Sequence, residues 1–111
     1  MVNDKDYKIV VGKEAVKEVK TEKLNYVLDS LIISSNKPCE IDIQFAEISS
    51  VHIYTVRNHS GNKYIVIRKE CINDKDERFV QSYDKWLLNN RLLITVRGVE
   101  GTVVDLTLRC E

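Results

Sequence analysis

Short segments in which apolar and polar residues alternate at period two dominate this chain. The clearest is Thr102–Glu111, where Val104, Leu106, Leu108 and Cys110 fall on one side. Successive side chains on a strand leave opposite faces, so such a segment buries one face and exposes the other. Repeated along the chain, the pattern predicts an all-β protein, an antiparallel β-sandwich of about eight strands.

Two segments leave the type of element open. Ala15–Thr21 fits a short helix or an edge strand. Leu24–Ser34 has apolar residues at helical spacing, but its apolar run Leu31–Ile33 favours a strand. The other strands are expected at Tyr7–Val11, Cys39–Phe45, Val51–Arg57, Lys63–Lys69, Phe79–Tyr83, Arg91–Arg97 and Thr102–Glu111.

Turn-forming residues separate the predicted strands. Ser34–Pro38 is expected to turn the chain into Cys39–Phe45, and Asn58–Asn62, which contains a glycine, is expected to close a hairpin. Asn73–Asp76 is expected to be an exposed loop. Tyr64–Ile67 is apolar on both faces, which predicts a central strand covered within the sandwich or at a subunit interface.

The apolar strand faces also predict the core. Its members share one property, an apolar side chain in phase with its strand neighbours: Cys39, Ile41, Ile43, Phe45, Leu92, Ile94, Val96, Val104, Leu106 and Leu108.

Length and charge narrow the class of protein. The 111 residues are enough for a single domain, 1–111. The 17 basic and 17 acidic residues cancel and are interspersed, whereas nucleic-acid binding needs a clustered basic surface. Apolar runs are far shorter than the roughly twenty residues of a membrane helix, and the amino terminus lacks a secretory signal. We therefore expect no nucleic-acid partner, no membrane partner and synthesis in a cytoplasm.

No residue pattern predicts catalysis, a cofactor or a metal. Cys39, Cys71 and Cys110 have neither zinc-binding spacing nor the even count of a disulfide framework, and Cys39 and Cys110 are expected to be buried. His52 and His59 have no associated nucleophile motif, so we expect surface or interface roles for both. The acidic run at 73–77 lacks the glycine and distal glutamate of a calcium loop.

Aromatic residues are the candidate interface positions. They are Tyr54, Tyr64, Tyr83 and Trp86. Such side chains on a β-sandwich stack on sugars or take part in protein–protein contacts. They also commonly cover the ends of a core, and their spacing does not decide between these roles.

Two stretches carry a resemblance to a known family. Val27–Asn36 followed by Cys39–Phe45, and Trp86-Leu87-Leu88 followed by Leu92–Val96, a Gly-x-x-Gly turn and a Val-x-Leu-x-Leu strand, resemble small jelly-roll proteins of tailed-bacteriophage virions. The resemblance covers most of the chain from Leu24 and lies in the order and spacing of the predicted strands. Relatives often carry Gly-Asp before the penultimate strand, where this chain has Asn89-Asn90-Arg91.

The resemblance implies a non-catalytic structural protein, a capsid decoration or head/tail auxiliary protein located in the virion and made in the bacterial host cytoplasm. Its partners would be other virion proteins and copies of itself, with a trimer as the expected oligomer. A carbohydrate-binding β-sandwich module is the alternative, although such modules usually present several exposed aromatic residues and this chain has one Trp. A cupin-like enzyme would need a cluster of metal-binding histidines, and this chain has two His and no His-x-His.

Overall fold

The computed structural model describes residues 3–23, 28–47, 52–66, 77–79 and 91–110, and these ranges contain strands but no helix. The strands are β1 (Asn3–Val10), β2 (Val16–Lys20), β3 (Leu28–Phe45), β4 (His52–Val66), β5 (Glu77–Phe79), β6 (Leu92–Arg97) and β7 (Val103–Cys110). Every strand pair is antiparallel. The predicted all-β, antiparallel class is therefore confirmed.

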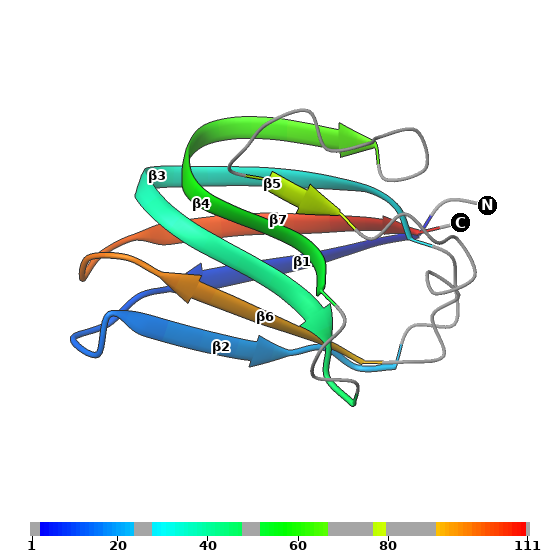
Figure 1. Ribbon diagram of the computed structural model, residues 1–111, viewed down its shortest axis with the longest axis horizontal. Helices are drawn as coiled ribbons and strands as arrows, with labels where there is room; N and C mark the ends of the chain where they lie inside the picture. The colour runs from blue at the N-terminus through cyan, green and yellow to red at the C-terminus, as the bar shows by residue number, and fades with distance from the viewer. Residues whose placement is uncertain (1–2, 24–27, 48–51, 67–76, 80–90, 111) are drawn as a thin grey trace.

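The two longest strands, β3 and β4, give the sheet its shape (Figure 1). They pair with each other as a long curled hairpin. The first half of β3 also pairs with β7, and its second half pairs with β6. As a result the strands lie in the order β1-β7-β3-β4 in one layer and β2-β6-β3-β4-β5 in the other. The sheet folds over on itself and is nearly closed into a barrel.

The two predicted turns inside this hairpin are wrong. Ser34–Pro38 and Asn58–Asn62 lie within β3 and β4, which continue through them. A register shift between Ser35 and Cys39 absorbs the extra residues as a bulge, so the ladder resumes at the Cys39–His59 pair. Gly61, with φ of 76°, lies opposite Ser35 at this bend. The four strands predicted on either side of these turns are therefore two long, bent strands, β3 and β4.

The remaining element predictions have mixed outcomes. Ala15–Thr21 contains strand β2, and the described part of Leu24–Ser34 is strand, as favoured. Of the strand predicted at Phe79–Tyr83, Phe79 ends β5, whose described residues begin at Glu77. The loop predicted at Asn73–Asp76 lies outside the described residues, as does Cys71.

The predicted core is confirmed in full, because every residue assigned to it is at most 5% exposed. Between the layers these side chains are joined by others from β1, β3 and β4, among them Ile9, Ile33 and Ile53. Tyr64 of the predicted central strand Tyr64–Ile67 is not covered within the sandwich: its side chain is 54% exposed, and within the described residues this half of β4 pairs only with β3. The alternative, cover at a subunit interface, stays a prediction.

Polar contacts close the two ends of the molecule. At the bend, the Asn36 side-chain amide donates to the Gly101 carbonyl (3.2 Å), and its oxygen accepts from the Val103 amide (2.7 Å). After β2, the Thr21 amide donates to the Leu92 carbonyl at 2.8 Å, and the buried Thr21 hydroxyl oxygen accepts from the Leu92 amide at 2.9 Å. Both contacts join segments far apart in sequence.

Candidate functional site

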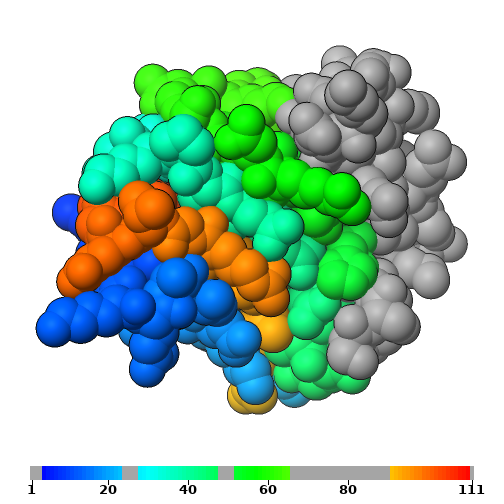
Figure 2. All heavy atoms as spheres, turned by 60° about the vertical axis from the view of Figure 1, so that its left-hand side comes forward, coloured from blue at the N-terminus to red at the C-terminus, as the bar shows by residue number. Residues whose placement is uncertain are grey.

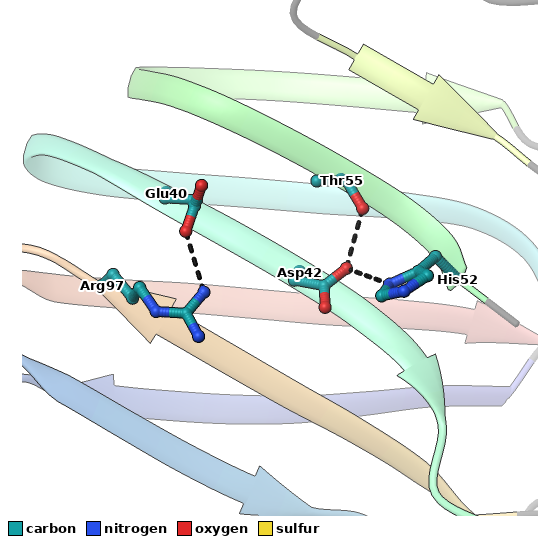
Figure 3. A network of polar contacts seen from close by, with 5 residues as sticks. All are labelled: Glu40, Asp42, His52, Thr55 and Arg97. Atoms are coloured by element: carbon teal, nitrogen blue, oxygen red, sulfur yellow. Dashed lines mark hydrogen bonds and ion pairs between the residues drawn. The ribbon is translucent and has the colours of Figure 1, made fainter. Parts of the chain in front are cut away.

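One outer face of the molecule, over β6, β3 and β4, carries a network of polar side chains (Figure 3). Period-two alternation along β3 turns Glu40 and Asp42 outward while their apolar neighbours enter the core. The Arg97 guanidinium of β6 donates to Glu40 Oε2 at 2.9 Å. His52 Nδ1 and Thr55 Oγ1 of β4 both donate to Asp42 Oδ1, at 2.8 and 2.7 Å.

The contacts of this network join side chains of neighbouring strands. A hydroxyl nucleophile needs a base within hydrogen-bond reach, but Thr55 donates to the Asp42 carboxylate and does not bond the imidazole. Glu40 and Asp42 each have their own partner on a neighbouring strand. The space-filling view shows the surface strands side by side in the order β2, β6, β3 and β4 (Figure 2). The network spans three of these strands.

The outer face of the other layer, over β1 and β7, combines charged and aromatic side chains. Arg109 Nε donates to Asp4 Oδ1 at 3.2 Å, and Thr107 Oγ1 donates to Asp6 Oδ1 at 2.7 Å. The hydrogen bond and charge of Asp4 raise the pKa of Arg109. On β4 the exposed Tyr64 lies in the same cross-strand row as Thr107. Tyr64 is therefore an aromatic side chain on this face that a partner could contact.

The candidate interface residues separate into three cases. Tyr64 is exposed, whereas Tyr54 is completely buried in the core and is removed from the candidate surface. The reason is a bulge: the register shifts between Ile43 and Gln44, so that Ile53 and Tyr54 both turn inward. Tyr83 and Trp86 lie outside the described residues.

The two histidines also differ. His52 lies at the surface, as expected, but the expectation for His59 is wrong because its side chain is buried at the bend of β4. There His59 Nε2 bonds the Gly61 carbonyl at 3.0 Å. Burial lowers the pKa of His59; the hydrogen bond to the Gly61 carbonyl raises it in part, and the Lys63 charge lowers it by a smaller amount. The imidazole is therefore held neutral inside the fold.

This burial predicts a pH dependence of stability. The unfolded chain takes up a proton at His59 near its ordinary pKa of about 6.5, before the folded chain does. The contribution is fully present above that value and is lost as the pH falls through the lowered folded-state pKa. Urea unfolding between about pH 7.5 and pH 5 should show His59→Gln with a shallower loss of stability than the native chain. Equal slopes for the native chain and His59→Gln would contradict the assignment.

The buried thiols of Cys39 and Cys110 should be inert. Burial raises the pKa of both, which keeps them protonated and weakly nucleophilic. We expect alkylation by iodoacetamide to leave both unmodified in the native chain and to modify both after unfolding, as read by peptide mass spectrometry. Added reductant should leave the unfolding midpoint unchanged. Rapid native modification of Cys110 would show that the β7 end of the core opens readily.

Other features of the described residues add little chemistry. A shallow, open depression lies over β1 and β7, lined by Asp6, Tyr7, Lys8, Asp105, Leu106 and Thr107. Within the described ranges no three metal-ligating side chains gather, and no helix has the length and apolarity needed to cross a membrane.

Sequence reasoning missed the role of the β1 charges. The alternation of Asp4, Asp6 and Lys8 predicts only a solvated face. Their cross-strand neighbours follow from the β1–β7 register, which a single sequence does not encode. No protein-family model matches this chain, and no curated protein sequence matches it either.

Proposed function

We propose that this chain is a non-catalytic structural protein of a bacteriophage virion, a capsid decoration or head/tail auxiliary protein, with a jelly-roll fold. The observation that carries the proposal is the order of strand pairing. Apart from the short β5 at the end of one layer, strands β1, β2, β6 and β7, with two halves each of β3 and β4, make eight segments in two layers. A jelly roll has this number of strands in two sheets, and viral capsid proteins are among its users.

The virion role rests on the sequence resemblance together with this pairing order, since one fold hosts many functions. Assembly with virion proteins and with copies of itself would use the exposed side chains of the outer faces. Tyr64 supports this use because aromatic residues are enriched at protein interfaces.

Gradient-purified particles from the host that carries this sequence provide the test. Peptides of the chain should sediment with intact particles and stay with them after a salt wash, at a fixed ratio to the major capsid protein. A chain found only in the host lysate would overturn the virion role. Binding of the purified chain to an immobilised glycan, with no particle association, would favour the carbohydrate-binding alternative.

A further inference from the structure

Strand β1 has one hydrogen-bonding edge that no described strand covers. It pairs with β7 along Asn3–Val10 without a register shift, and it ends the strand order of its layer. An unbulged edge of this length presents a row of backbone N–H and C=O groups that can pair with another strand. The other described edges are shorter: β2 offers Val16–Lys20, β5 offers Glu77–Phe79, and the half of β4 that pairs only with β3 runs from Gly61 to Val66.

The side chains along this edge are complementary to themselves in one register. Asp6 and Lys8 both point outward and are exposed. Thr107 occupies only one oxygen of Asp6, and Lys8 forms no ion pair with any described residue. If two β1 strands run antiparallel with Tyr7 opposite Tyr7, each Asp6 lies opposite Lys8 of the other copy.

The neighbouring register is less favourable. Shifting the pairing so that Asp6 faces Asp6 also sets each Asp4 opposite Lys8, but Asp4 is already bound by Arg109. It places two Asp6 carboxylates directly opposite each other as well, and like charges in such positions destabilise a strand pair. In the Tyr7-centred register the outward positions hold two Asp6–Lys8 pairs, and Asp4 faces the uncharged Val10.

We propose that a second copy of this chain binds along β1, through antiparallel β1–β1 pairing about a twofold axis, with Asp6 of each copy opposite Lys8 of the other. This joins two β1-β7-β3-β4 layers into one continuous sheet. A self-complementary edge produces a twofold dimer, whereas the trimer expected from the sequence would need contact between two different surfaces. The inference deepens the self-assembly part of the proposed function but does not depend on the virion location. A monomer in light scattering would therefore overturn the dimer alone, and absence from purified particles would overturn the virion role alone.

Charge reversal tests the pairing. The native chain should be a dimer in solution, with about twice the 12.9 kDa mass of one chain. Lys8→Glu places like charges opposite each other twice and should weaken the dimer roughly tenfold to a hundredfold in sedimentation equilibrium. Adding Asp6→Lys to Lys8→Glu restores opposite charges and should recover most of the affinity. Lys20→Glu on β2 is the matched control and should leave the dimer unchanged.

Cysteine cross-linking tests the register without relying on charge. Opposed residues in an antiparallel pair have Cα atoms about 4.5–5.5 Å apart, within the range of a disulfide. Asp6→Cys chains refolded together with Lys8→Cys chains should give an oxidised dimer. Either variant alone should not, and the native chain controls for its own cysteines. A native monomer at all concentrations, a trimer, a dimer sensitive to Lys20→Glu but not to Lys8→Glu, or equal cross-linking by each variant alone would overturn the proposal.

Discussion

Replacement of Leu106 by alanine is expected to lower the free energy of unfolding by about 2–5 kcal/mol. Leu106 is 1% exposed and lies in the middle of β7, between Tyr7 of β1 and Ile33 of β3. Truncation removes apolar contacts on both sides and leaves a cavity, because neighbouring strands hold the backbone in place. The cost falls at the lower end of the range if β1 can move inward to fill the space.

Urea unfolding monitored by far-ultraviolet circular dichroism gives this value directly. Asp105→Ala is the matched control: it lies one residue earlier on β7, faces outward and is exposed, so its effect should stay within about 0.5 kcal/mol. A near-zero loss for Leu106→Ala would mean that β7 is not packed in the core.

Thr21→Val is expected to cost about 1–3 kcal/mol, although the two side chains have almost the same shape. The Thr21 hydroxyl oxygen accepts a hydrogen bond from the Leu92 backbone amide at 2.9 Å, and Thr21 is only 3% exposed. Valine leaves that amide buried without its acceptor, and desolvation of the unpaired group is the source of the cost. The contact joins the end of β2 to the start of β6, so its loss loosens the β2 edge.

Thr107→Val separates this effect from the loss of any hydroxyl. Thr107 also donates a hydrogen bond, but it lies on the outer face, where water can replace the partner of Asp6. We expect a loss below about 1 kcal/mol for Thr107→Val in the same urea titration. Equal losses for the two variants would contradict the role assigned to the Thr21–Leu92 contact.

Period-two patterning predicts the core well because burial and alternation have the same cause. On β3 and β7 the strand geometry alternates the faces, and one face must be apolar to pack against the other layer. Cys39, Ile43 and Leu106 could therefore be assigned to the core without any knowledge of their neighbours.

Bends are where the same reasoning fails. Pro38 and Gly61 belong to residue types that usually end a strand, yet here they lie in a bulged bend through which pairing continues. Local sequence does not distinguish a turn that reverses the chain from a bend that carries a strand between layers. The wrong expectation for His59 has the same cause. Its polar neighbours predict a solvated loop, whereas His59 is buried at the bend of β4.

A bulge also explains why Tyr54, a candidate interface residue, is buried. Strict alternation places Ile53 and Tyr54 on opposite faces, but a register shift beside Ile43 buries both. The Asp42–His52–Thr55 contacts likewise depend on which β4 residues face β3. Such cross-strand registers depend on long-range pairing, so a single sequence predicts the residues of a face but not their partners.

The most direct test of assembly is the mass of the untagged native chain in solution, measured by light scattering over a hundredfold range of concentration. The account predicts a dimer of about twice 12.9 kDa at the upper concentrations, dissociating on dilution to a single chain. A mass of one chain at every concentration would contradict it.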